Sequence, residues 1–437
     1  MSAEPSHAIT DLIPAPRPCA GLRNAAVILV IVGGLLSVAA LISDVHRARF
    51  GFAYLWAFSF VWAVALGALF FVGLQHLVHA VWSVAVRRIA EMFAGLIWLV
   101  AILFVPLLLY CIYNDRFGLY PWLDANKVAH DSLLSGKKAY LNLPFFTVRA
   151  VVFFALWIAF AAYFTGGSLK QDAGRGGVEV SLRMRRTAAP FMMLFAVTAT
   201  FASIDWLMSL EPLWFSTIFG VYVFSGMVVT SLSIISIATV WLRSSGRLGR
   251  GIVGDGHLYN LGVLLFGFVC FWAYIAFSQY MLIWYGNIPE ESFYLIRRLD
   301  GGWLVLSIAL ALVRFVIPFL ALLSRPAKIN ATRLVWVSVL LLLGQFLDLY
   351  WLIMPQIHHD QPVVGWPEFG PPLLMLGALA LYISHFLKRY LPLAVGDPLP
   401  EMPVFLLPHR FVRLSLEPSY TEAFESLARR FRHVLEN

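Results

Sequence analysis

The chain has 437 residues, of which 60% are hydrophobic and 13% charged, and its formal net charge is +8. Soluble domains carry about a quarter charged residues, so this composition cannot cover the surface of a soluble protein of this length. Apolar runs of about eighteen residues or more recur along the chain, which excludes a soluble enzyme, a disordered scaffold and an outer-membrane barrel. The sequence predicts an all-α polytopic membrane protein.

Apolar runs bounded by charged residues, glycine and proline predict ten transmembrane helices. They cover residues 24–43, 51–81, 91–113, 145–165, 187–208, 214–242, 258–283, 302–323, 332–355 and 369–388. Each can cross about 30 Å of hydrocarbon at 1.5 Å per residue. A polar segment precedes the first span, and no small-residue cleavage site is clearly placed after it, so we expect this span to be retained.

Basic residues concentrate in alternate loops, for example at Arg87 and Arg88, while fewer lie in the other set, for example Arg297 and Arg298. By the positive-inside rule, this imbalance predicts that both termini are cytoplasmic. In a membrane protein the net positive charge is first an orientation signal, so nucleic acid is not an expected partner. The longest outer loops are then 114–144, 284–301 and 356–368.

The chain after the last span contains a Pro-rich stretch, 391–408, followed by a candidate amphipathic helix. Ser419 and Glu422 have capping-box spacing. Four apolar residues then fall on one face, Phe424, Leu427, Phe431 and Leu435. This helix could lie on the inner membrane surface or on a neighbouring subunit.

A short pattern recurs in the spans and predicts an internal repeat. Asp205 and Pro212 enclose six residues, as do Asp348 and Pro355. Two arginines also follow a valine at matching places, Arg149 in the fourth span and Arg314 in the eighth. Four helices separate equivalent elements, and an even number preserves direction, so spans two to five and six to nine are predicted to be parallel repeats.

Ionisable residues inside spans are costly unless they are paired or hydrated, so each is a candidate functional residue. Counted along the helices, Arg149 lies at the depth of Asp205, and Arg314 lies within side-chain reach of Asp348. We therefore expect two charge pairs, Arg149 with Asp205 and Arg314 with Asp348, between the last two helices of each bundle. The pairs could serve helix packing alone or take part in proton movement.

His76 and His79 lie three residues apart near the cytoplasmic end of the second span and are expected on one helical face. They could relay protons, form packing or headgroup contacts, or ligate one shallow haem with His257 or His385. The three cysteines, Cys19, Cys111 and Cys270, form no CxxC group. Covalently attached haem, thiolate iron–sulfur clusters and structural zinc are therefore not expected. Since the histidine-ligated haem is the least favoured of the three alternatives, we expect no haem or metal site of the chain's own.

Further residues occupy the outer half of the predicted spans and could form an outer vestibule or, for Trp206, Gln279, Tyr280 and Tyr285, contact quinone. With Asp205, Glu211 and Asp348 they could carry protons or ions to outer water. These residues are Trp206, Gln279, Tyr280, Tyr285, Gln345 and Tyr350.

Three strings carry a resemblance to a known family: SIDWLMSLEP at 203–212, WFSTIFGVY at 214–222 and FWAYIAFSQYMLIWYGNIPEE at 271–291. They resemble the second quinone-binding-type membrane subunit of bacterial alternative complex III, a quinol:cytochrome c oxidoreductase. That subunit belongs to the wider family of polysulfide-reductase-type membrane subunits. The ten-span layout extends the likeness over about 24–388. At Val263 this sequence departs from relatives that often carry lysine there, so an inner proton entrance using that lysine must differ.

The resemblance implies two four-helix bundles flanked by the first and last helices in the bacterial inner membrane. The expected segments are a cytoplasmic segment 1–23, a flanking helix 24–50, bundles 51–208 and 209–355, an outer loop with the last helix 356–388 and a cytoplasmic tail 389–437. It implies iron–sulfur, multihaem c and paralogous membrane subunits as partners, beside membrane lipid.

The expected function is that of a subunit that is not catalytic alone and that contacts quinone, conducts protons, or does both. Quinol oxidation releases protons with electrons, so an apolar slot beside a carboxylate or imidazole suits it. Two rivals are a secondary transporter with parallel repeats and a b-type cytochrome anchor.

Overall fold

The computed structural model describes residues 16, 18–113, 118–249 and 251–397. Within these ranges the regular elements are all helical, and ten helices or joined helices are long and apolar enough to span a membrane. They are α2 (Ala20–Ile42), α3 (Arg47–Leu77), α4 with α5 (Val84–Ala94, Ile97–Ile112), α9 (Leu143–Asp172), α10 with η3 (Gly177–Trp206, Met208–Leu210), α11 (Phe219–Ser244), α12 (Asp255–Gly286), α14 with η4 and α15 (Gly301–Ala311, Leu312–Val316, Ile317–Leu322), α17 with η5 (Ala331–Ile353, Met354–Gln356) and α18 (Trp366–Arg389). The prediction of ten apolar membrane-length helices is confirmed.

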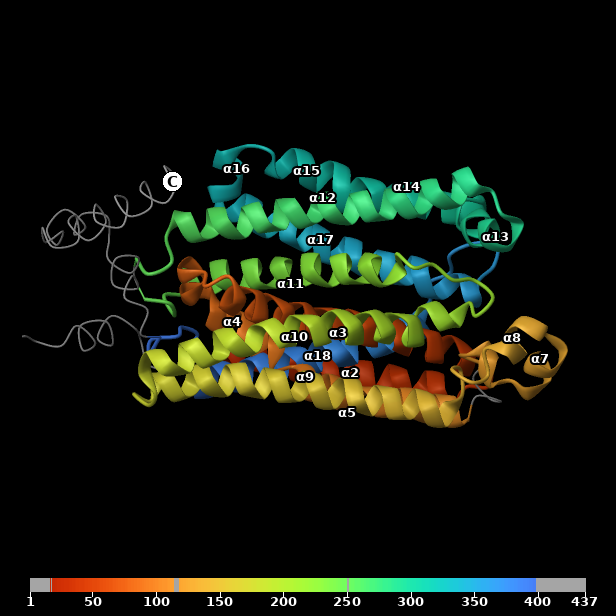
Figure 1. Cartoon of the computed structure of the whole chain (residues 1–437), viewed down its shortest axis with the longest axis horizontal. Helices are drawn as coiled ribbons and strands as arrows, with labels where there is room; N and C mark the ends of the chain where they lie inside the picture. The colour runs from red at the N-terminus through yellow and green to blue at the C-terminus, as the bar shows by residue number, and fades with distance from the viewer. Residues whose placement is uncertain (1–15, 17, 114–117, 250, 398–437) are drawn as a thin grey trace, which may run out of the picture.

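The long helices run along one axis of an elongated bundle (Figure 1). Short helices lie at its two ends: η1 (Val81–Ser83), η2 (Pro121–Leu123), α7 (Ala125–His130), α8 (Ser132–Gly136), α13 (Pro289–Arg298) and α16 (Arg325–Ile329). Helices α7, α8 and α13 lie at the right end of Figure 1, called the α13 end below, and α16 lies at the left, the α16 end.

Helix α3 is the centre of the bundle. All its residues from Phe50 to Gly73 are buried, because α4, α5, α10, α11, α17 and α18 pack around it. A helix that is apolar on every side is stable only when it is enclosed in this way. Gly67 lets α11 approach closely, since a Cβ there would lie 2.3 Å from the carbonyl oxygen of Met227.

The first and last spans, α2 and α18, pack against each other through glycines. A Cβ at Gly33 would lie 2.2 Å from the backbone nitrogen of Leu374, and one at Gly377 would lie 2.8 Å from the backbone nitrogen of Val30. Small residues at such contacts allow membrane helices to gain van der Waals packing at short range. Arg49 fastens α18 to α3, because its Nε and Nη2 donate to both carboxylate oxygens of Glu368 at 2.8 and 2.7 Å.

Several elements differ from the sequence-based prediction; for example, the fourth span continues to Asp172 and the fifth begins at Gly177. The third span begins earlier, so Arg87 and Arg88 belong to α4 and are buried, although the sequence placed them in a loop. Helix α11 begins at Phe219 and not at residue 214, because the chain turns at Glu211 and Pro212. Helix α13 is a short helix inside the predicted 284–301 loop. The candidate helix at Ser419 and Glu422, by contrast, lies outside the described residues.

One span contains a local irregularity. Leu312–Val316 forms a π-helical turn, η4, between α14 and α15. Pro318 has no N–H to donate to the carbonyl of Arg314, which explains why the α-helical hydrogen bonding is interrupted there. Single π turns inside α-helices are frequent at functional sites. This turn carries the buried side chain of Arg314.

Candidate functional site

The most polar buried group of the second half of the bundle is centred on Asp348 of α17. Arg314 of η4 forms an ion pair with its Oδ2, and Tyr222 of α11 donates its phenol O–H to Oδ1. A second guanidinium nitrogen, Nη2 of Arg314, donates to Oε1 of Gln345 at 2.7 Å. Asp348 is 1% exposed, so both oxygens depend on these partners. The ion pair expected between Arg314 and Asp348 is therefore present, and Tyr222 is an additional partner.

The guanidinium of Arg314 is held in place by packing as well as by charge. Its Cζ lies 4.1 Å from the ring centroid of Trp272, a cation–π contact. Gly344, one turn before Asp348, leaves room for it, because a Cβ there would lie 2.7 Å from Cγ of Arg314. Gly226 similarly leaves room for Gln345. Two glycines thus allow bulky polar side chains between three closely packed helices.

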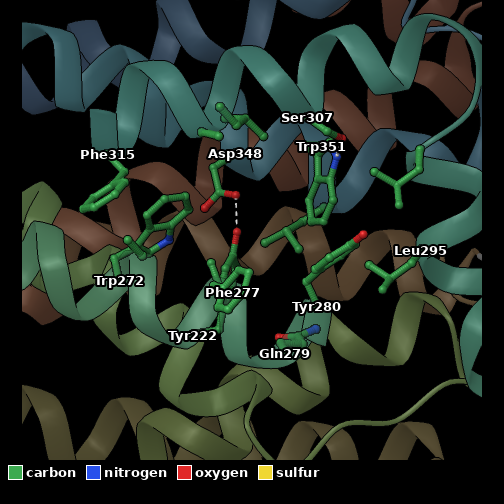
Figure 2. A pocket seen from close by; sticks show the side chains of 16 residues that line it. Tyr222, Trp272, Phe277, Gln279, Tyr280, Leu295, Ser307, Phe315, Asp348 and Trp351 are labelled. Carbon is green, nitrogen blue, oxygen red and sulfur yellow. Dashed lines mark hydrogen bonds between the residues drawn. The ribbon is translucent and has the colours of Figure 1, made fainter. Parts of the chain in front are cut away.

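Asp348 lies in the wall of a cavity of about 420 Å³ (Figure 2). Most of the lining is apolar, including Ala273, Ala276 and Leu310. Hydrogen-bonding side chains in the lining are Tyr222, Trp272, Gln279, Tyr280, Ser307, Asp348 and Trp351. The cavity therefore combines apolar walls with a few hydrogen-bonding groups, the usual make-up of a small-molecule site.

Two of these side chains, Trp351 and Gln279, differ in their hydrogen bonding. The indole N–H of Trp351 donates to the hydroxyl of Ser307 at 2.8 Å, which fixes one wall. Oε1 of Gln279 is buried and has no hydrogen-bond partner among the described residues. Such an oxygen is available to accept a hydrogen bond from a ligand, and Figure 2 places Gln279 beside Tyr280 on α12.

The first half of the bundle contains the other expected pair. Nε and Nη2 of Arg149 donate to the two carboxylate oxygens of Asp205 at 2.7 and 3.0 Å, a bidentate ion pair between α9 and α10. The ring of Tyr140 lies 3.9 Å from Cζ of Arg149. Burial, with the charge of Asp205 as a second cause, raises the pKa of the Tyr140 phenol, which therefore stays protonated. Asp205 is buried and does not line the 420 Å³ cavity.

Glu211 is paired by a residue that sequence reasoning missed. Its Oε1 lies 3.1 Å from Nη2 of Arg298 on α13, and Arg298 is fully buried. Arg298 also donates to the backbone carbonyls of Trp351 and Leu352 at 3.2 and 3.1 Å. Arg298 therefore positions two residues of the cavity wall. Pro at the start of 289–298 and paired arginines at its end were the available signal for this helix.

Four of the predicted vestibule residues do not line the 420 Å³ cavity: Gln345, which binds Arg314, and the three that follow. Trp206 is buried in an aromatic cluster with Phe58, Trp62, Phe104, Phe154 and Trp157. Tyr285 is 85% exposed and does not line the cavity. Tyr350 donates to the carbonyl of Val363 at 2.7 Å and stacks on Trp303. Tyr285 is six residues after Gln279 on the same helix and therefore points to another side of it. Trp206 and Tyr350 lie on other helices, whose rotation directs them to other neighbours.

The two histidines do not share a helical face. His76 is buried in α3 and stacks on Phe164, with ring centroids 5.3 Å apart. His79 lies beyond the end of α3 with φ of 51°, exposed. Because α3 ends at Leu77, a spacing of three residues does not place His79 on the same helical face as His76. Both still line one small cavity at the α16 end, together with Arg87 and Asp397.

Within the described residues, no group of three or more His, Cys, Asp or Glu side chains is arranged to hold a metal ion. Comparison of the sequence with models of known protein families finds no match, and no curated protein is detectably similar to the chain.

Proposed function

We propose that this chain is an integral membrane subunit of a quinol:cytochrome c oxidoreductase of the alternative complex III type, not catalytic alone. It contacts quinone in the 420 Å³ cavity and conducts protons through its buried carboxylates. The observation that carries the proposal is the position of Asp348 and Tyr222 in the wall of an apolar cavity. A quinone ring and tail need apolar walls, and a quinol needs a nearby acceptor for its protons.

The proposed organisation is two parallel repeats, α3 to α10 and α11 to α17, with α2 and α18 flanking them. In each repeat an arginine of the third span pairs with an aspartate of the fourth, Arg149 with Asp205 and Arg314 with Asp348. The α16 end is cytoplasmic and the α13 end faces out, as the distribution of basic residues favours. The membrane is the bacterial inner membrane, and the partners are iron–sulfur, multihaem c and paralogous membrane subunits.

A secondary transporter with parallel repeats is the second candidate. The π-helical turn at Leu312–Val316 favours it, because transporters often place a helix irregularity beside a buried charged residue. Purification of the tagged chain from its native membrane separates the two. A complex subunit co-purifies with proteins that show c-haem absorbance and reduces cytochrome c with quinol. A chain purified alone and active in solute transport would overturn the proposal.

Binding of a short-chain ubiquinone and a short-chain menaquinone tests the cavity. Trp272 and Trp351 line it, so tryptophan fluorescence should be quenched on binding. Ala276→Phe fills the cavity and should weaken binding by about tenfold or more, which corresponds to about 1.4 kcal/mol. Ala155→Phe, at an exposed position on α9, is the matched control and should bind normally. Equal affinities in both variants would remove the cavity from the proposal.

A further inference from the structure

A second buried polar cluster lies at the α16 end, far along the bundle from Asp348. It joins α4, the last residue of α9 and the segment that follows α18. Its charged members are Arg87, Arg88, Glu91, Asp172 and Asp397. Glu91 and Arg88 are both 0% exposed, so this is an interior cluster and not a solvated face.

The ion pairs in this cluster are unequal. Arg87 pairs closely with Asp397, and Arg88 pairs closely with Asp172. Glu91 is held more loosely: its Oε1 lies 3.3 Å from Nε of Arg87, and its Oε2 lies 3.4 Å from Nη1 of Arg88. No hydrogen bond of good geometry reaches Oε2 of Glu91 or Nη1 of Arg88. Glu91 is therefore the carboxylate with the weakest contacts to the arginines.

The charges do not balance when all groups are ionised. Among the described residues, two arginines form ion pairs with three carboxylates, so the paired groups carry one net negative charge, with the exposed Arg185 of α10 nearby. An uncompensated buried charge costs several kcal/mol, so one added proton that neutralises the cluster is favoured. Asp172 keeps a partly exposed side chain and accepts from the backbone N–H of Gly396 at 2.9 Å, whereas Glu91 has neither support. Glu91 is the group that this proton would occupy.

Other buried polar atoms around the cluster lack partners among the described residues. They are Nε of Arg88, Oγ of Ser168, Oε1 of Gln171, Oε1 of Gln75 and Nε2 of His76. Buried polar groups are normally satisfied by protein or by ordered water, so this region suits a short chain of waters. A small cavity lined by His76, His79, Arg87 and Asp397 lies beside the cluster, and the exposed Arg185 of α10 also lines it.

The groups that face Glu91 come from each neighbouring element. Arg87 and Arg88 of its own helix and Ser168 and Asp172 of α9 interact with Glu91 itself, while Asp397 and His76 of α3 interact with Arg87. Helix α18, which also packs against α4, places the hydroxyl of Tyr382 beside Gly95. Ser181 and Arg185 contribute from α10 at the cavity. Helix α11, which also packs against α4, has no charged residue before Arg243.

We propose that Glu91 takes up a proton from water at the α16 end, and that Asp397 restricts this uptake by pairing with Arg87. In the uptake step the proton leaves hydronium and forms an O–H bond with the Glu91 carboxylate. This inference rests on the proposed proton conduction, for which it names the loading group.

Infrared difference spectra of the purified complex in membranes, recorded across pH without quinol, test the first part. The protonated carboxyl band should vanish in Glu91→Gln and move in frequency in Glu91→Asp, which keeps an ionisable group if the first variant folds poorly. Glu179→Gln, in an exposed ion pair with Arg183, should leave the band intact. An unchanged band in Glu91→Gln would overturn the assignment.

Proton uptake and exchange test the route. Uptake from the α16 side during turnover should slow about tenfold or more in Glu91→Gln, and wild-type uptake would refute the loading role. Asp397→Asn weakens the ion pair with Arg87. The Glu91 carboxyl band should then exchange with D₂O faster than in the wild type, and equal exchange rates would refute the role of Asp397. A wild-type band in a complex that does not oxidise quinol would contradict the proposed function and still support protonation of Glu91.

Discussion

Tyr222 near the start of α11 donates a hydrogen bond to Asp348 near the end of α17. The two residues are 126 positions apart, and the contact joins helices that enclose the 420 Å³ cavity. Because Arg314 binds the other carboxylate oxygen, Asp348 is held between a cation and a neutral donor. A carboxylate held in this way keeps a fixed orientation at the cavity wall.

Replacing Tyr222 by phenylalanine should weaken both stability and quinone binding. The substitution removes one donor to a buried carboxylate, and hydrogen bonds to charged groups contribute about 1.5–3 kcal/mol. Thermal unfolding in detergent and the fluorescence titration measure the two effects. Tyr274→Phe, at an exposed position on α12, another helix of the cavity wall, is the control and should change neither. A Tyr222→Phe protein with wild-type stability would contradict the importance of this contact.

Arg314→Ala should destabilise the protein by about 3–5 kcal/mol, because it leaves Asp348 buried without its cation. Adding Asp348→Asn in the same chain should restore part of the loss, since no uncompensated charge remains. Unfolding free energies of the two single variants and the double variant measure the coupling. Arg183→Ala, at an exposed ion pair, should cost about 1 kcal/mol or less. Strictly additive losses would argue against a coupled pair.

Gly33→Ala should destabilise the contact between α2 and α18, whereas Gly34→Ala should not. The added methyl group at Gly33 meets the backbone of Leu374, and overpacking costs about 1–3 kcal/mol. Nothing lies within 4 Å of a Cβ at Gly34, where alanine should be neutral or stabilise the helix by up to about 1 kcal/mol. Thermal unfolding of the two variants measures the difference. Equal melting temperatures would contradict the close backbone contact between Gly33 and Leu374.

Acidification should destabilise the α13 end through His358. Burial, followed by the nearby Arg49, lowers the pKa of this imidazole. Below pH 6.5 the unfolded chain therefore binds more protons at this site than the folded chain, and stability falls as the pH decreases. Thermal unfolding at pH 7.5 and 5.5 should show a smaller loss for His358→Gln than for wild type. His130→Gln, on the exposed surface of α7, should keep the wild-type dependence.

The recurring Arg and Asp positions could be predicted as pairs because depth along a helix follows directly from residue number. The expected Arg149–Asp205 and Arg314–Asp348 ion pairs both occur in the structure. The contacts of Tyr222 and Arg298 were missed, because each binds a carboxylate on another element and no local sequence pattern predicts such a contact. The role of the two Arg–Asp pairs in proton movement stays a prediction.

The buried cluster around Glu91 was missed for a related reason. The sequence places Arg87 and Arg88 among loop cations, and a basic pair next to an apolar run is the usual sign of a span ending at the interface. In the structure Asp172 and Asp397 arrive from α9 and from the segment after α18 to neutralise them. Only the assembled bundle reveals that these charges are interior.

The amino-acid sequence alone determined the class of protein, because the number and length of its apolar runs predict the number of membrane-spanning helices. The recurring buried arginines and aspartates indicate which helices must contribute ion-pair partners. The tertiary structure decided which faces meet: it enclosed α3, placed Asp348 in a cavity wall and sent Trp206, Tyr285 and Tyr350 elsewhere. The physical reason is that an apolar helix has no preferred rotation of its own. Rotation is set by packing and by the pairing of buried polar groups contributed by distant parts of the chain.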